Sequence, residues 1–275
     1  MEDDDKLERD YVLGTHDEEL KRLELQHHVW RRRALDAWLD AGFTSGQTLM
    51  DLGCGPGYAA LDLAEIAGPI GTVIAMDRSR RFLDALHSNA VQRNRLNIRT
   101  LELDLDTDDL PEVQADGIWV RWVFAFVKNP RDLLRRARAS LKPGASLVVQ
   151  EYFDYAAWKL APRSDVFESF VAAVMKSWRA HGGEPDIGLD LVRWLSDEGF
   201  RLRRIRPITE IISPSHFVWR WPTAFVATGV DRLVQLGDLS EEKGREVKDV
   251  FARAEAQPDT LMVTPGVIEL IADAV

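Results

Sequence analysis

The sequence contains one cysteine among its 275 residues, Cys54. A single cysteine excludes a disulfide within the chain and a zinc site built from several cysteines. The HExxH zinc pattern is also missing, so we expect no bound metal. No apolar run reaches the 18 residues of a membrane-spanning helix, and we expect no signal peptide. The sequence therefore predicts a protein of the reduced cytoplasm with no membrane partner.

Positive charge is also scarce. The formal net charge is −10 and the pI is about 5.2, whereas a nucleic-acid substrate would need a dominant basic surface. Hydrophobic residues make up 45% of the chain and charged residues 29%, as in ordinary globular proteins. A chain of this length can bury one full core with a substantial addition. We therefore expect a small-molecule partner and no nucleic acid.

The most informative stretch is TLMDLGCGPGY, residues 48–58. An apolar run ends at Asp51, three glycines follow at alternate positions, and a helical pattern opens at Tyr58. A strand, a glycine turn and a helix in this order are typical of a nucleotide-type site in an open α/β sheet. The dinucleotide fingerprint would need a small residue at position 58. A carboxylate at the strand end would repel phosphate and pair with an ammonium group, which favours a cationic, phosphate-free nucleoside.

This stretch resembles the first motif of the class I S-adenosylmethionine-dependent methyltransferases, in particular those that act on small molecules. The resemblance implies an α/β, Rossmann-like fold with a seven-stranded, mostly parallel sheet and helices on both faces. It also implies S-adenosylmethionine as cofactor and in-line transfer of its methyl group. By the same resemblance, the cofactor-binding residues of the turn are Asp51, Gly53, Cys54, Gly55 and Gly57.

Two acidic residues farther along fit the same family. A strand over Thr72–Met76 leads to Asp77, 20 residues after Gly57, the distance at which a carboxylate meets the ribose hydroxyls. The alternative for Asp77 is a surface residue that caps the helix expected over 79–93. Next to it, Arg78 is a further cofactor candidate. After a strand over Ile98–Leu103, the family places an aspartate and the following amide at the adenine. Here these are Asp104 and Leu105, with Asp106 as the competitor.

The remaining strands are expected over Asp116–Val120, Ser146–Gln150, Phe200–Ile212 and Gly266–Ala274. The last of them would be antiparallel, although VIELIADAV could equally form a short helix. The strand over 116–120 leads into RWVFAFV, where Arg121 is a cofactor candidate and Trp122 lines the expected pocket. A helix over Pro130–Leu141 and the L-K-P-G turn after it are another landmark of the family.

The domain organisation follows from these elements. Residues 1–16 are expected to be flexible, 43–153 form the cofactor-binding core, and 154–275 hold the second half of the sheet with helical insertions. Helices over about 165–181 and 241–256 would act as substrate-binding lids. The helical pattern over 17–42 precedes the first strand. It could close over the active site, as in many relatives of the family, or merely pack against one edge of the sheet.

Acceptor chemistry is less specific. A phenol, carboxylate or amine acceptor gains from a general base, for which Glu151 after the fifth strand and His181 are the candidates. His16, His27, His28 and His216 are further possibilities, and each histidine alone could be structural. Aromatic residues group at one predicted sheet edge, although each alone could belong to the core. The substrate-binding candidates among them are Tyr11, Trp122, Tyr152, Tyr155, Trp158 and Trp219.

The predicted function is methyl transfer to a small aromatic or apolar molecule, with oxygen the favoured acceptor atom and carbon or nitrogen possible. A homodimer is possible, since the helical additions offer surface for one. Two alternatives come from other classes: a non-catalytic protein that binds S-adenosylmethionine, and a nicotinamide-dependent oxidoreductase. The tyrosine at position 58 and the carboxylate of Asp51 weigh against the oxidoreductase.

Overall fold

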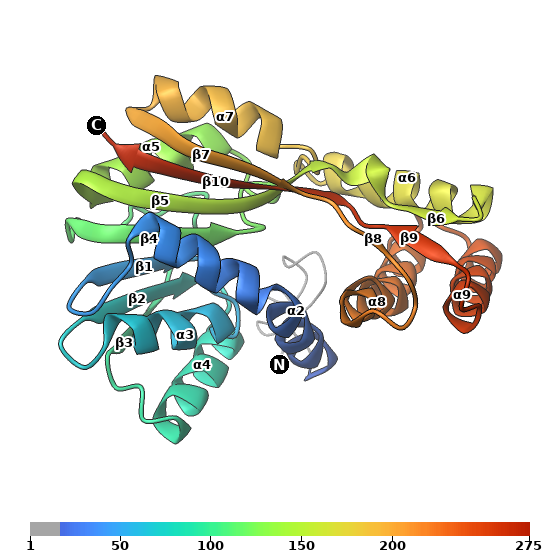
Figure 1. Ribbon diagram of the computed structural model, residues 1–275, viewed down its shortest axis with the longest axis horizontal. Helices are drawn as coiled ribbons and strands as arrows, with labels where there is room; N and C mark the ends of the chain where they lie inside the picture. Colours follow the sequence, from blue (N-terminus) through green and yellow to red (C-terminus); the bar gives the residue numbers. More distant parts are fainter. Residues whose placement is uncertain (1–16) are drawn as a thin grey trace.

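The computed structural model describes residues 17–275. Its centre is a seven-stranded sheet in the order β3-β2-β1-β4-β5-β10-β7 (Figure 1). Every neighbouring pair is parallel except the two that β10 makes with β5 and β7, so the predicted topology is confirmed. The strands are β1 (Thr48–Leu52), β2 (Thr72–Asp77), β3 (Ile98–Glu102), β4 (Ala115–Arg121), β5 (Leu141–Asp154), β7 (Phe200–Ile208) and β10 (Gly266–Ala274). The short-helix alternative for the last segment is wrong.

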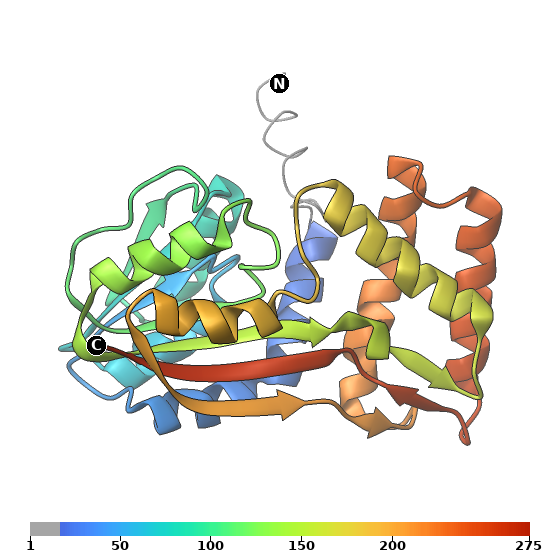
Figure 2. The ribbon, with the colours of Figure 1, turned by 90° about the horizontal axis from the view of Figure 1, so that it is seen from above.

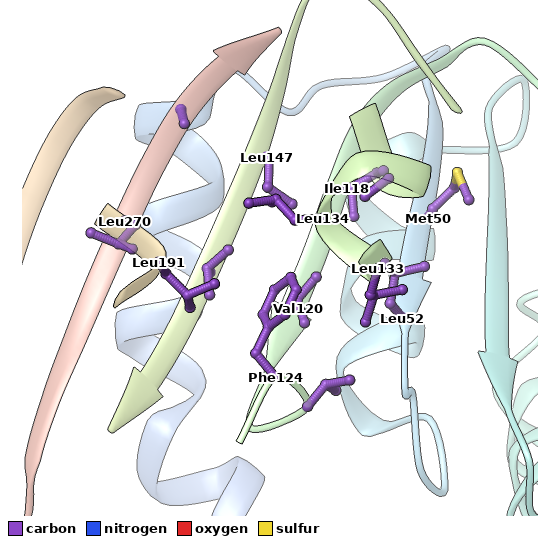
Figure 3. Close-up of a cluster of buried hydrophobic side chains, with 14 of the residues drawn as sticks. Met50, Leu52, Ile118, Val120, Phe124, Leu133, Leu134, Leu147, Leu191 and Leu270 are labelled. Carbon is purple, nitrogen blue, oxygen red and sulfur yellow. The ribbon is translucent and has the colours of Figure 1, made fainter. Parts of the chain in front are cut away.

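Helices cover both faces of this sheet, because alternate strand residues point to opposite sides. Leu49 packs with α2 (Asp17–Ala41), α3 (Tyr58–Ala67) and α4 (Arg80–Gln92). Its neighbour Met50 points to the opposite face, which is covered by α5 (Pro130–Ser140) and α7 (Gly188–Asp197). Figure 3 shows that second face, where strand side chains such as Val120 meet helical leucines such as Leu133.

Two predicted boundaries need correction. The fifth strand begins at Leu141, earlier than expected, because the L-K-P-G segment joins the strand through a register shift opposite residues 115–117. The strand predicted over 200–212 is divided into β7 and β8 (Ile211–Ile212). The division occurs at Glu210, whose amide donates to the hydroxyl of Thr264 rather than to a strand neighbour. As a result, β8 joins a second sheet.

The second sheet carries a helical module, which comprises residues 155–181 and 211–263. Its strands are β6 (Lys159–Ala161), β9 (Leu261–Val263) and β8, in the order β6-β9-β8. They continue β5, β10 and β7 past the end of the central sheet, and α6 (Asp165–Ala180), α8 (Arg220–Leu236) and α9 (Glu241–Ala256) gather beside them (Figure 2). Because β6 follows the carboxyl end of β5, the module stands at the edge where ligands bind in sheets of this kind.

The helices predicted near 165–181 and 241–256 are present as α6 and α9. The aromatic stretch HFVWRWPTAF also forms helix, first the short turn Phe217–Trp219 and then the start of α8, which the sequence reasoning missed. Its Pro222 lies in the first turn of α8, where a missing amide hydrogen costs no helical hydrogen bond. Within residues 17–275 no helix is both long and apolar enough to cross a membrane.

Candidate functional site

The glycine turn joins β1 to α3, and its three glycines have positive φ angles of 66°, 54° and 79° at Gly53, Gly55 and Gly57. A Cβ atom on Gly53 would lie 2.5 Å from Val123, and one on Gly57 would lie 2.3 Å from Leu86. On Gly55 the nearest atom would be Leu23 Cδ1 at 4.0 Å. Two of the glycines are therefore required by packing within the protein, while a Cβ atom on Gly55 would make only ordinary contact with Leu23.

Asp51 lies at the end of β1 and is 2% exposed. Its Oδ2 atom is buried and has no hydrogen-bond partner among residues 17–275. Burial raises the pKa of Asp51 to about 8, and the attraction of Arg121 offsets part of that rise. The carboxyl group is therefore mostly protonated at neutral pH in this structure.

Arg121 ends the neighbouring strand β4, and its Nη1 atom is also buried without a partner in the described part of the chain. Burial lowers the pKa of Arg121 to about 10, while the carboxyl of Asp51 pulls it upward. Buried polar atoms are normally hydrogen-bonded. An unpartnered acceptor and an unpartnered donor at the ends of adjacent strands therefore indicate a ligand with complementary groups.

Asp77 ends β2 and is 6% exposed. Its Oδ2 accepts a hydrogen bond from the amide of Gly55 and its Oδ1 accepts one from the amide of Ser79, both at 2.8 Å. The cap of α4 is Ser79, whose hydroxyl accepts from the amide of Phe82. The alternative of a surface helix cap at Asp77 is therefore wrong, and the structure joins this carboxylate to the glycine turn.

The two candidates after β3 differ in their surroundings. Asp106 accepts a hydrogen bond from the amide of Lys128 at 2.6 Å, so its carboxylate is occupied by the loop that follows β4. Asp104 is half-buried and precedes the buried Leu105. Within residues 17–275, its carboxylate accepts a hydrogen bond from the amide of Asp106. This difference favours Asp104 over its competitor. Arg78 follows Asp77 directly in the sequence, just past the end of β2.

Glu151 was expected after the fifth strand, at an open mouth of the site, but β5 extends to Asp154 and Glu151 lies within it. It is 0% exposed, and its Oε1 accepts hydrogen bonds from the amides of Val123 and Phe124 at 2.6 and 2.7 Å. Burial raises the pKa of Glu151 to about 8. Trp122, the residue before Val123, has a φ of 53°, a left-handed conformation that a bulky residue rarely adopts. The carboxyl of Glu151 thus braces the turn after β4.

An aromatic group occupies the junction of α2, β4, β5 and α8, and we define it as Trp30, Trp122, Tyr152 and Trp221. The ring of Trp122 is within 20° of parallel to Tyr152 and within 16° of parallel to Trp221, with centroids 5.5 and 5.7 Å apart. Trp30 meets both tryptophans edge-on at 5.2 Å. The sequence had placed Trp30 only in a helical pattern. Its assignment to this group depends on how α2 docks, which no local pattern reveals.

Three aromatic residues predicted to bind substrate are not members of this group. Tyr155 is buried against the edge of Tyr152. Trp158 packs on Phe167 and donates from its indole nitrogen to the sulfur of Met262, and Trp219 packs on Phe251. Both tryptophans belong to the interior of the helical module, because α6, α8 and α9 enclose them. The interior interpretation therefore replaces the substrate-binding one for Trp158 and Trp219. Tyr11 and His16 lie outside the described residues.

The histidines also need reassignment. His181 is an exposed cap at the end of α6, and its Nδ1 lies 2.8 Å from the carbonyl of Ser177. His216 similarly caps the turn before α8, and His28 is exposed. The histidine that reaches the site is His27 on α2, whose Nδ1 lies 3.2 Å from Nη2 of Arg121. His181 is therefore not retained as a catalytic candidate.

A surface cavity of about 390 Å³ is lined by residues of α2, of α3 and of the segment that follows α4. None of its lining residues belongs to the glycine turn. The lining consists of His28, Arg31, Leu61, Asp62, Glu65, Arg93 and Arg95. Among residues 17–275, no cluster of three metal-ligating side chains occurs there or elsewhere.

The comparisons with known proteins find similarity to methyltransferases in sequence and in fold. Residues 50–149 match the family model described as a methyltransferase domain. A 37.1 kDa protein of transposon Tn4556 from Streptomyces fradiae is 31% identical over 186 residues, which cover 64% of this chain and 49% of that protein. The demethylmenaquinone methyltransferase of Lactococcus lactis is 26% identical over 126 residues, or 46% of this chain and 49% of that enzyme.

Among solved structures, a protein from Bacillus halodurans described as a methyltransferase superposes with a TM-score of 0.60 at 15% identity. The superposition covers 87% of this chain and 97% of that one, and shows a shared fold. The chain spans about half the length of the curated relatives it matches. Sheet order and glycine turn define a Rossmann-like α/β protein of the methyltransferase type. Over residues 50–149, the chain is similar to the family described as a methyltransferase domain.

Proposed function

We propose that the protein transfers the methyl group of S-adenosylmethionine to a small aromatic or apolar molecule. The observation that carries this proposal is the pair of buried, unpartnered atoms, Oδ2 of Asp51 and Nη1 of Arg121. The methionyl part of the cofactor has an ammonium and a carboxylate group on one carbon. An ionised Asp51 complements the ammonium, and Arg121 complements the carboxylate.

The other cofactor residues follow from their places around the turn. We assign the ribose hydroxyls to Asp77, since its carboxylate ends β2 and is joined to the glycine turn through the amide of Gly55. Asp104 and the amide of Leu105 are assigned to the adenine, and Arg78 to the ribose side. We assign Gly55 to the nucleoside, because packing within the protein does not require a glycine there, while Gly53, Cys54 and Gly57 shape the turn itself.

The bound cofactor supplies a methyl group already activated on a sulfonium, so the protein mainly orients the acceptor and excludes water. The aromatic group offers flat faces for a planar acceptor. Because these rings pack on one another, we propose that α2 and α8 move apart to admit it. Oxygen is the first acceptor atom to test. Carbon is the second, because a relative from Pseudomonas entomophila, 24% identical over 127 residues, is a C-methyltransferase of ubiquinone and menaquinone biosynthesis. The possible homodimer and the cytoplasmic location stay predictions.

Asp77→Ala tests the cofactor assignment. We expect wild-type protein to bind S-adenosylhomocysteine, and the variant to lose about 1–3 kcal/mol of binding free energy with the charge-assisted ribose hydrogen bonds. Calorimetric titration measures both, and NAD⁺ serves as the control ligand. Unchanged affinity in the variant would refute the assignment of Asp77. Binding of NAD⁺ in place of S-adenosylhomocysteine would favour an oxidoreductase instead.

The raised pKa of Asp51 predicts that binding of S-adenosylhomocysteine releases a proton. With its pKa raised to about 8 by burial, Asp51 is mostly protonated at pH 7, and a cationic ammonium beside it favours the carboxylate. We expect about one proton to be released for each S-adenosylhomocysteine bound near pH 7. Calorimetry in buffers of different ionisation enthalpy measures this number. Asp51→Asn is the control and is expected to abolish the release; an equal release in that variant would contradict the role of Asp51.

A further inference from the structure

The orientation of Arg121 depends on one histidine of α2. Its guanidinium lies against the rings of Trp119 and Trp122, 5.6 and 5.2 Å from their centroids. These aromatic contacts hold the group near the site but leave open how it is turned about its axis. The contact between Nη2 and Nδ1 of His27, at 3.2 Å, fixes that rotation. It therefore decides where the unpartnered Nη1 points.

The protonation state of His27 follows from its two neighbours. An arginine nitrogen can only donate, so Nδ1 of His27 accepts and its hydrogen resides on Nε2. Nε2 lies 3.0 Å from Oδ2 of Asp62 and donates to it. Burial lowers the pKa of His27 to about 4, which keeps the ring neutral at ordinary pH. His27 is thus a neutral relay with one donor and one acceptor, both in use.

Asp62 on α3 is held by a second residue of α2. Arg31, one helical turn after His27, donates to both oxygens of Asp62 at 2.7 and 3.0 Å. Burial raises the pKa of Asp62, but the hydrogen bonds from His27 and Arg31 outweigh it, so the carboxylate stays ionised. A continuous chain of contacts therefore runs from Arg31 at the surface through Asp62 and His27 to Arg121.

We propose that His27 is a positioning residue which, held by Asp62, orients Arg121 toward the carboxylate of the cofactor's methionyl part. This inference rests on the proposed function. It links the docking of α2 to recognition of one end of the cofactor, since His27 and Arg31 both belong to this helix. The nucleoside end depends on Asp77 and Asp104 and does not involve α2 through this relay.

Two ligands allow binding at the methionyl end of the cofactor to be distinguished from binding at its nucleoside end. S-Adenosylhomocysteine carries the ammonium and carboxylate groups, whereas 5′-methylthioadenosine has the same nucleoside and thioether without them. We expect His27→Ala to weaken binding of S-adenosylhomocysteine about tenfold, as for loss of one oriented charged contact, and to leave 5′-methylthioadenosine within about twofold. Asp62→Ala should give the same pattern. His27→Asn should restore part of the affinity, because its amide oxygen replaces the acceptor Nδ1.

Asp40→Ala is the matched control, since it removes the ion pair with Arg204 that holds the opposite end of α2. It should change neither ligand's affinity by more than about twofold. Equal weakening of both ligands by His27→Ala, or no change in either, would overturn the relay. Arg121→Met and Asp51→Asn distinguish this failure from that of the proposed function. If these two variants also leave the ratio of the affinities for S-adenosylhomocysteine and 5′-methylthioadenosine unchanged, the assignment of Asp51 and Arg121 to the methionyl part is wrong.

Discussion

Replacement of Gly57 by alanine is expected to lower the free energy of unfolding by about 2–5 kcal/mol. About 1–2 kcal/mol comes from placing a Cβ atom at a φ of 79°, and about 1–3 kcal/mol from overpacking against Leu86, 2.3 Å away. The turn also positions Asp51 and the start of α3, so affinity for S-adenosylhomocysteine should fall with stability. Urea unfolding measures the first effect and calorimetry the second.

Gly144 is the matched control for this substitution. Its φ is also 79°, but a Cβ atom there would meet nothing within 4 Å. Gly144→Ala should therefore cost only the backbone strain of about 1–2 kcal/mol. The double variant Gly57→Ala/Leu86→Ala should be less destabilised than the sum of the single variants, because each relieves the other. Equal costs at the two glycines would show that the contact with Leu86 does not matter.

Replacement of Glu151 by alanine is the second substitution expected to lower the free energy of unfolding by a large amount. It leaves the amides of Val123 and Phe124 buried without an acceptor, at about 1–3 kcal/mol each. Glu151→Gln retains an oxygen at the same place and should stay within about 1 kcal/mol of wild type. If Glu151 braces the turn, the glutamine variant keeps its turnover number. A folded glutamine variant without turnover would restore the general-base hypothesis.

The pH dependence of stability supplies an independent readout. Burial raises the pKa of Glu151 from 4.5 to about 8, so between these values the folded state binds more protons than the unfolded state. Its contribution is therefore present at low pH and is lost as the pH rises, by up to about 1.4 kcal/mol per pH unit. Glu151→Gln should remove this slope, while Asp51 continues to contribute a similar one. Unfolding in urea across pH 5–8 measures the difference.

Much of the central sheet could be predicted, because its strands are short apolar runs bounded by turn residues. The positions of Asp51 and Asp77 also follow from local sequence, since each stands where a strand ends. In both cases the informative residues are neighbours in the chain. The same reasoning gave the antiparallel last strand, although its mostly apolar run, interrupted by Glu269 and Asp273, had left a helix open.

The contacts that build the site join distant residues, and no local pattern reveals them. His27 and Asp62 are 35 positions apart, and His27 and Arg121 are 94 apart. Glu151 was expected just after the fifth strand, where a catalytic carboxylate would stand. It lies within β5, and its partners 27 and 28 positions earlier make it a brace. Trp122 and Trp158 likewise stand in similar aromatic surroundings. Trp122 lies in the site and Trp158 in the interior because of how the helical module packs, which is visible only in the structure.

The position of β10 between β5 and β7 affects how the protein is made. Residues 261–274 supply the middle strand on one side of the central sheet and of the whole second sheet. During synthesis, β5 and β7 must wait with unpaired backbone edges until this segment leaves the ribosome. Such exposed edges invite pairing with other chains. Completion of the fold is therefore a late event, and newly made chains are most exposed to aggregation just before it.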